Sequence, residues 1–240
     1  MKSSPLKYLP GLALGIFSIV STAQAALITT IPVLPPLGGV YLSTDVHQIF
    51  GGPALQFILT LPEHAPIAEQ ASRHPGGLPG TGIPGTPADE VEDFPSNFRG
   101  MVDVLQNGNS ITGGPQPVSA SGPVQTIVFG KTGNVTGSFD TEMLQMNLSG
   151  NTPLGGFMIR ESPTKQSLGH TSIQNIGGGE FRIDSFFDVF TELSIDGGAT
   201  WMPSTSGPGH VTLVPEPSSM VLCGLGIVAV GLAAFRRRKQ

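Results

Sequence analysis

The 240-residue sequence predicts an all-β protein: a single β-sandwich-like domain with long Gly/Pro loops, flanked by an N-terminal signal peptide and a C-terminal transmembrane helix. Beyond Gly100, short strand-like runs recur about every eight to twelve residues, which is typical of sandwiches and barrels. Gly and Pro supply 33 and 22 residues, too many for a protein built from long helices. Both chain ends, by contrast, carry long apolar runs of the kind that enter membranes.

The first part of the body contains two predicted strands and one long loop. Residues 27–31 (LITTI) form the opening strand, and a Pro/Gly-rich connector follows it. Residues 54–62 (ALQFILTLP) form the second strand. Residues 73–93 are predicted to be a flexible loop, because the stretch 73–87 holds four prolines and five glycines and has few groups to bury.

The second part of the body consists of strand-like runs. Their ranges are 101–105, 124–129, 135–139, 142–148, 156–160, 180–184 and 185–195. Successive side chains of a strand point to opposite sides, so Leu144, Met146 and Leu148 are predicted to share one face. The last two runs alternate in the same way. Their predicted faces are Phe181, Ile183, Phe187, Val189, Leu193 and Ile195 on one side, and Arg182, Asp184, Asp188, Glu192, Phe186 and Phe190 on the other.

The N-terminus has the layout of a secretory signal peptide, residues 1–25. Lys2 and Lys7 precede an apolar stretch, residues 9–20, and Ala23 and Ala25 form a small-x-small cleavage site. Cleavage by signal peptidase is expected after Ala25, with the next bond as second choice. The body, residues 26–214, is therefore expected outside the cytoplasm.

The C-terminus has the layout of a membrane anchor. Residues 218–235 are long enough to nearly span a hydrocarbon core as a helix. Four consecutive cations follow, namely Arg236, Arg237, Arg238 and Lys239. Such a cluster stays on the cytoplasmic side, which favours a membrane helix over a buried core helix.

The residues before this anchor carry a family resemblance. Val214, Pro215, Glu216 and Pro217, followed by an apolar span and an Arg-rich end, resemble the PEP-CTERM sorting domain of Gram-negative bacteria. The resemblance covers residues 215–240 and implies that exosortase, a membrane-embedded cysteine protease-transpeptidase, cuts near the motif. It implies a protein that is exported, held by its C-terminal helix and then sent to the cell surface or the exterior. Without the resemblance, the residues predict a protein anchored by one C-terminal span.

Composition limits the partners of the body. Between residues 26 and 214 there are six Lys/Arg and sixteen Asp/Glu, a net charge of −10. A body of this charge repels nucleic acid, so no nucleic-acid partner is expected. The single cysteine, Cys223, lies in the predicted span, so the body has no disulfide and no catalytic thiol.

One stretch of the body, Ser194–Trp201 (SIDGGATW), resembles the Asp box of sialidase-like propellers. The resemblance implies that Asp196 caps the turn through its side chain, that Gly198 supplies an unusual backbone angle, and that Trp201 packs back. The motif occurs once here, which indicates a structural hairpin rather than a glycosidase. The wider segment 137–201 also resembles uncharacterised PEP-CTERM surface proteins, which implies shared architecture only.

Polar residues elsewhere give no enzyme signature. Asp184 and Asp188 share a strand face but lie about 13 Å apart at about 3.3 Å per residue, farther than a glycosidase pair. The acidic residues 89–93 lack the spacing of a calcium loop. Five histidines are scattered without a metal-binding pattern: His47, His64, His74, His170 and His210. The sequence therefore predicts no catalytic residue, cofactor or metal site.

Together these observations predict a non-enzymatic, exported cell-surface or extracellular-matrix protein with an adhesive or structural role. The alternative is a carbohydrate-binding or carbohydrate-cleaving β-domain that uses Ca²⁺ and contacts surface polysaccharide. Exposed aromatic residues on a concave face would favour binding, whereas two close, buried carboxylates in a cleft would favour cleavage.

Overall fold

The structure is a computed structural model that describes residues 26–43, 48–77, 86–152 and 154–216. Over these residues the predicted all-β class is confirmed, and the one helical element is a 3-10 turn, η1 (Ala68–Gln70). The strands are β1 (Leu27–Thr29), β2 (Gly39–Leu42), β3 (Gln48–Gly52), β4 (Leu55–Pro66), β5 (Ser72–Pro75), β6 (Glu90–Gln106), β7 (Asn109–Ser110), β8 (Gln116–Val128), β9 (Gly137–Thr152), β10 (Gly155–Glu161), β11 (Ser167–Gly177), β12 (Glu180–Val189), β13 (Thr191–Ser194), β14 (Met202–Pro203) and β15 (Gly209–Pro215).

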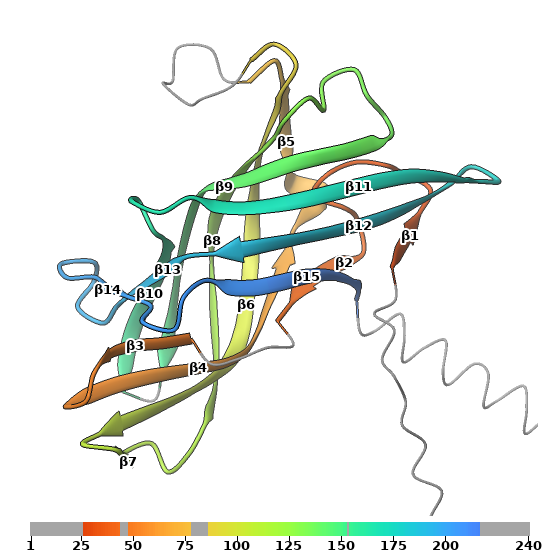
Figure 1. Cartoon of the computed structure of the whole chain (residues 1–240). Coiled ribbons are helices and arrows are strands. Elements are labelled where there is room, and N and C mark those ends of the chain that lie inside the picture. The colour runs from red at the N-terminus through yellow and green to blue at the C-terminus, as the bar shows by residue number, and fades with distance from the viewer. Residues whose placement is uncertain (1–25, 44–47, 78–85, 153, 217–240) are drawn as a thin grey trace, which may run out of the picture.

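Eight strands form one closed antiparallel barrel (Figure 1). Their order around the ring is β12, β15, β2, β4, β6, β8, β9 and β11, and β11 pairs again with β12. The predicted two-sheet sandwich is therefore corrected to a barrel. The reason is β11, which bonds to β9 on one side and to β12 on the other, so that neither neighbour is left with a free edge.

Strand β11 escaped the sequence pattern because its inward positions are small or polar. Ser167 and Thr171 are buried and face the interior, and Ile173 is the one large apolar residue among the buried positions of this strand. Such a strand shows no apolar alternation. Two other strands of the ring, β2 and β15, also lie outside the runs that the sequence predicted.

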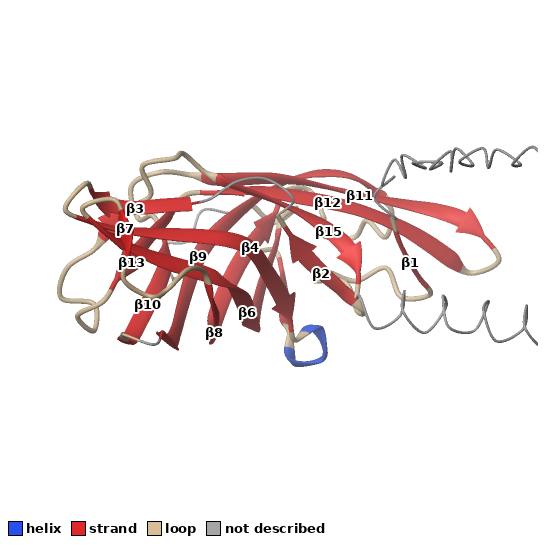
Figure 2. Cartoon of the chain, turned by 90° about the horizontal axis from the view of Figure 1, so that it is seen from below, coloured by secondary structure: helices blue, strands red, loops and turns tan. Residues whose placement is uncertain are grey.

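The two halves of the ring cross one another. In Figure 1, β11, β12 and β15 run across the direction of β6 and β8, and Figure 2 shows them as a separate upper layer. Shorter strands pair with the ends of ring strands beyond the closed part: β10 pairs with β9 and is followed by β13 and β14, while β3 pairs with β4 and β1 pairs with β12. The barrel is thus a single sheet folded over, which accounts for its sandwich-like strand spacing.

A β-bulge changes the predicted faces of β9. Its pairing with β8 shifts register so that Gln125 opposes Gln145 while the next residue, Thr126, opposes Met143. The extra residue is Leu144, which is only half-buried, and Met143 points inward instead. The prediction that Leu144 faces the same side as Met146 and Leu148 is therefore wrong.

The alternation predicted for residues 181–195 is confirmed within β12. Ile183, Phe187 and Val189 are buried, and Asp184 and Asp188 lie on the opposite face. The run then breaks, because the amide of Phe190 bonds to the Ser167 hydroxyl and β13 pairs with β10 instead. The predicted faces of two residues after the break are also wrong. Glu192, which was predicted on the polar face, is buried, and Ile195, which was predicted on the apolar face, is exposed.

The predicted loop 73–93 is too wide. Strand β5 occupies its first residues and β6 starts at Glu90, and these two strands pair with each other. Asp89 fixes the turn before β6, because its carboxylate accepts the backbone amides of Thr86 at 2.6 Å and Gly130 at 2.8 Å. Acidic residues here therefore belong to ordered structure, and two of them, Asp89 and Glu92, are buried.

Several sequence predictions concern residues outside the described part of the chain. These are the signal peptide 1–25 with Ala23 and Ala25, the span 218–235, Pro217, and the cations Arg236, Arg237, Arg238 and Lys239. Within the described ranges, no helix has the length and hydropathy that a membrane crossing requires.

Glycines allow β8 and β9 to approach closely. A Cβ atom placed on Gly150 would overlap the carbonyl oxygen of Ser119 and lie 2.9 Å from the Cβ of Ala120. We therefore expect Gly150→Ala to lower the free energy of unfolding by about 1–3 kcal/mol, the usual effect of overpacking. The measurement is urea unfolding of the purified protein.

The control for this variant is Gly156→Ala on β10. A Cβ at Gly156 would meet nothing nearer than 3.8 Å, so its unfolding midpoint should match that of the wild type. Equal midpoints for both variants would contradict the close approach of β8 and β9.

Candidate functional site

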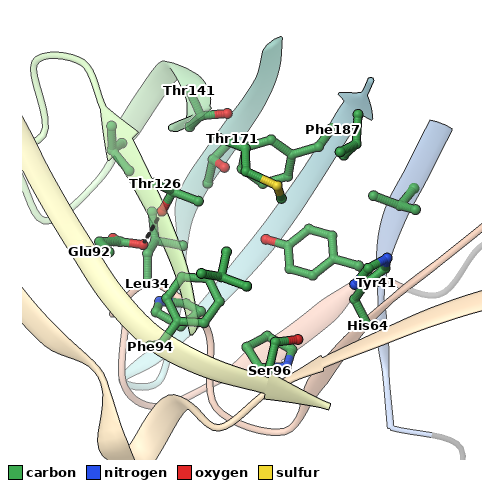
Figure 3. Close-up of a pocket in the computed structure, with 17 residues that line it drawn as sticks. Leu34, Tyr41, His64, Glu92, Phe94, Ser96, Thr126, Thr141, Thr171 and Phe187 are labelled. Atoms are coloured by element: carbon green, nitrogen blue, oxygen red, sulfur yellow. Dashed lines mark hydrogen bonds between the residues drawn. The ribbon is translucent and has the colours of Figure 1, made fainter. Parts of the chain in front are cut away.

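The barrel interior gathers polar side chains from most strands of the ring (Figure 3). At one level they surround a cavity whose other walls are apolar, including Leu34, Phe94 and Phe187. The polar residues that line it, in chain order, are Tyr41 of β2, His64 of β4, Glu92 and Ser96 of β6, Thr126 of β8, Thr141 of β9 and Thr171 of β11. The buried Ser185 of β12 joins this set through its contacts with Tyr41 and Thr171. Apart from Glu92 and Ser96, these residues lie far apart in the sequence and on different strands, so only closure of the ring brings their side chains together.

Three of these hydroxyl groups form a chain across the barrel wall. The Tyr41 hydroxyl donates to Ser185 Oγ at 3.1 Å, and Ser185 Oγ lies 2.8 Å from Thr171 Oγ1. The Tyr41 ring packs edge-on against Phe187. Burial raises the pKa of the Tyr41 phenol, so the group stays neutral and acts as a hydrogen-bond donor.

Glu92 is the buried acid of this site. Its side chain is almost inaccessible, and Oε2 accepts a hydrogen bond from Thr126 Oγ1 at 3.3 Å, while Oε1 has no hydrogen-bond partner among the described residues. The pKa of Glu92 is raised to about 8, mainly by burial and in smaller part by the charge of Glu90. At neutral pH the carboxyl group is therefore protonated.

His64 adds a neutral imidazole to the wall. Its ring packs against Phe98 with the two centroids 5.0 Å apart. Burial lowers the pKa of His64 to about 4, so the imidazole carries no charge at neutral pH. The interior site therefore contains ionisable groups but no charge.

The cavity between these side chains is small, about 40 Å³. This volume holds about three water molecules. Ordinary small-molecule sites have volumes of about 300–1,000 Å³. The interior is therefore suited to hydration of buried polar groups rather than to a substrate.

A second polar cluster lies on the outer face of β9 and β11. His170 Nδ1 lies 3.0 Å from Asp140 Oδ1, and its Nε2 lies 2.8 Å from Ser138 Oγ. This sequence of contacts has the order of a Ser-His-Asp triad. The Asp140 side chain, however, is 83% exposed, so water screens its charge, whereas the aspartate of a triad is buried.

The neighbouring strands repeat this contact pattern. His210 Nδ1 lies 2.7 Å from Asp188 Oδ1, and its Nε2 lies 3.3 Å from Thr212 Oγ1. The Phe186 ring stands between the two histidines, with centroid distances of 6.5 Å to His170 and 5.3 Å to His210. An open groove runs beside these residues and is lined in part by Phe186, Asp188, His170 and Asp140.

The Asp-box-like stretch joins β13 to β14. Asp196 accepts hydrogen bonds from the amide of Thr200 at 2.9 Å and from the Ser194 hydroxyl at 2.8 Å. Bonds from Thr200 and Ser194 hold the pKa of Asp196 at about 2. The amide of Gly198, which has a positive φ of 90°, bonds to Ser194, and the Trp201 indole bonds to the Gly198 carbonyl at 3.0 Å.

This turn is connected to the barrel wall through Arg160. The guanidinium lies 4.1 Å from the centre of the Trp201 ring and makes two hydrogen bonds to Glu192 Oε2, at 2.9 and 2.7 Å. The Ser162 hydroxyl donates to the other carboxylate oxygen of Glu192. Glu192 is thus fully paired and holds the hairpin in place.

The described residues contain no group of three or more His, Cys, Asp or Glu side chains that could hold a metal ion. The acidic residues after Asp89 point to different sides of the sheet. Asp93 bonds outward to Gln125 and lies 3.3 Å from His74, whereas Glu92 faces the interior.

The predicted sorting residues lie at the end of the last barrel strand. Val214 pairs with Val40 of β2 and is buried, and Pro215 pairs with Gly39. The amide of Glu216 bonds to the carbonyl of Gly38 at 3.0 Å. Residues 213–239 match the PEP-CTERM protein-sorting motif. The chain carries a PEP-CTERM domain.

The PEP-CTERM motif indicates a protein that is sorted through exosortase to the cell surface. The resemblance drawn from residues 214–217 and the tail is thereby confirmed. No curated protein and no solved structure matches the chain.

The interior site was the main omission of the sequence reasoning. A signal for it exists in β6, where Glu92 stands in phase with Phe94 and Phe98, so its side chain points to the core side. The outer cluster has no comparable signal, because Asp140, His170 and Phe186 become neighbours only through pairing in the sheet.

The protonated state of Glu92 predicts a pH effect on stability. The folded protein holds this proton up to about pH 8, whereas the unfolded chain releases it near the ordinary value of 4.5. The free energy of unfolding should therefore decrease as pH rises through this window. In Glu92→Gln this contribution disappears, so the variant should lose less stability than the wild type between pH 4.5 and 8.

The measurement is urea unfolding across this pH range. Glu180→Gln, at the exposed first residue of β12, serves as the control and should follow the wild-type curve. A Glu92→Gln curve parallel to that of the wild type would show that Glu92 is ionised in the folded protein.

Proposed function

We propose that the protein is an exported, non-catalytic cell-surface or extracellular-matrix protein whose barrel has an adhesive or structural role. One observation carries the proposal: the last barrel strand continues without a linker into the sorting motif. The folded body and the signal that directs it are therefore adjacent in space as well as in sequence.

The proposed route uses both chain ends. Signal peptidase cuts after Ala25, the apolar span 218–235 halts export, and the cations that follow it stay in the cytoplasm. Exosortase then acts near the motif and releases the body from its helical anchor. Before that step the protein is held in the membrane.

The polar sites support a non-catalytic role. The interior cavity has room for a few waters only, and its acid and imidazole are uncharged at neutral pH. The outer His170 cluster has its carboxylate in water, where it stabilises an imidazolium poorly. The interior residues and the His170 cluster are therefore better suited to stabilising the barrel than to catalysis.

A second candidate function is the binding of neutral polysaccharide on the outer face. The supporting observation is the half-exposed Phe186 ring beside an open groove that carries Asp188 and His170. Aromatic rings pack on the C–H faces of sugars, and carboxylates and imidazoles bond to their hydroxyl groups. The net charge of −10 favours a neutral glycan over an anionic one.

The delivery route is tested at the terminal cations. Replacing Arg236, Arg237 and Arg238 with Gln removes the charges that hold the tail in the cytoplasm. We expect the variant to be mislocalised, with a much smaller share of the protein at the cell surface in surface-labelling experiments. Wild-type surface levels would contradict the proposed topology.

The second candidate is tested with Phe186→Ala. If the groove binds neutral glycans, this variant should lose about tenfold in affinity for polysaccharides that the wild type retains on a glycan array. The control is Phe190→Ala, which removes a half-buried aromatic ring just after β12 that does not line the groove. No glycan binding by the wild type would end this candidate.

A further inference from the structure

We propose that the folded barrel shields the first half of the sorting motif, so that a processing protease can cut only on the C-terminal side of Glu216. The mature body then keeps Val214, Pro215 and Glu216 as its C-terminus. This inference rests on the proposed delivery by exosortase, but the shielding itself is a property of the barrel and is testable without that enzyme.

The first step of the argument is the position of β15 in the ring. It pairs with β12 through residues 209–212 and with β2 through residues 212–215, so each of these residues has at least one strand partner and Thr212 has two. Val211, Leu213 and Val214 are buried. Removing this strand from its neighbours therefore opens the barrel and exposes its core.

The second step is the extent of the pairing. It continues into the motif, because Pro215 pairs with Gly39 and the Glu216 amide still bonds to the Gly38 carbonyl. Proteases bind their substrates as extended segments whose backbone groups are free to pair with the enzyme. The backbone of Val214–Glu216 is already paired on one side with residues 38–40, so a protease that needs those groups requires local opening.

The third step is the packing around this strand end. Gly39 lies against Leu213 and Leu27, because a Cβ placed on Gly39 would lie 2.7 Å from Leu213 Cδ1 and 3.0 Å from Leu27 Cδ2. Leu27 is the first residue of β1 and is buried. The segment that follows the predicted signal-peptidase site therefore helps to cover the strand that precedes the sorting site.

The decisive experiment digests the full chain, purified in detergent, with proteinase K and determines the new C-termini by mass spectrometry. We expect the tail to be trimmed to Glu216 or a residue after it. C-termini at Pro215 or earlier, produced while the far-UV circular dichroism of the barrel is intact, would overturn the proposal.

A matched pair of variants tests the cause. Gly39→Ala should push Leu213 away and loosen the end of β15, raising the fraction of chains cut before Val214 by about five- to thirty-fold. Gly52→Ala, where a Cβ would meet nothing within 4 Å, should leave that fraction unchanged. Equal fractions in the two variants would contradict shielding by the strand pairing.

A heating series covers the case in which Gly39→Ala does not fold. In the wild type, cuts before Val214 should appear only at temperatures where the circular dichroism signal of the barrel is lost. Upstream cuts well below that transition would overturn the shielding.

The same mass spectrometry on protein from cells that carry exosortase separates the two proposals. Mature C-termini at or after Glu216 support the shielding, and C-termini at Pro215 or earlier overturn it. An intact Arg-rich tail on surface-exposed protein would instead contradict delivery by exosortase, and the proteinase K digestion would still decide the shielding.

Discussion

Closure of a single sheet is the constraint on which the other features of this barrel depend. Strand β11 supplies it by pairing with β9 and β12 at once. Closure removes the free edges that would otherwise invite aggregation, and it turns eight inward faces toward one shared interior. The polar residues of that interior, from Tyr41 to Ser185, have no other means of meeting. The integrity of β15 matters for the same reason, since each ring strand is needed to complete the circle.

The interior shows how a closed barrel tolerates polar groups. Tyr41, Ser185 and Thr171 satisfy one another through hydrogen bonds, and a proton on Glu92 replaces a charge that the surroundings could not solvate. Charged groups are placed elsewhere, on the outer face or at the rim, where Arg160 pairs with Glu192. This separation keeps the cavity narrow and uncharged, and it leaves binding to external ligands to the outer surface.

Features that depend on residues close together in the sequence could be predicted, whereas features that depend on contacts between remote segments could not. The apolar alternation around Ile183 and Phe187 predicted strand β12, and the tail motif predicted the sorting signal. The barrel was missed because the inward Ser167 and Thr171 of β11 resemble loop residues. The bulge at Leu144 was missed because register is set by the partner strand. Predicting the interior site would have required both the closure of the ring and the register of its strands, because its residues come from separate strands.

The placement of the two strand ends has an orientational consequence. β1 starts and β15 finishes on the same side of the barrel, and the hairpins of β3–β4 and β13–β14 lie at the opposite side (Figures 1 and 2). In the proposed anchored state, the end of β15 is the part of the barrel nearest the lipid, and the hairpins β3–β4 and β13–β14 face away from it. The Trp201 turn, secured by Arg160, is then among the first parts of the molecule that a neighbouring cell or polymer meets.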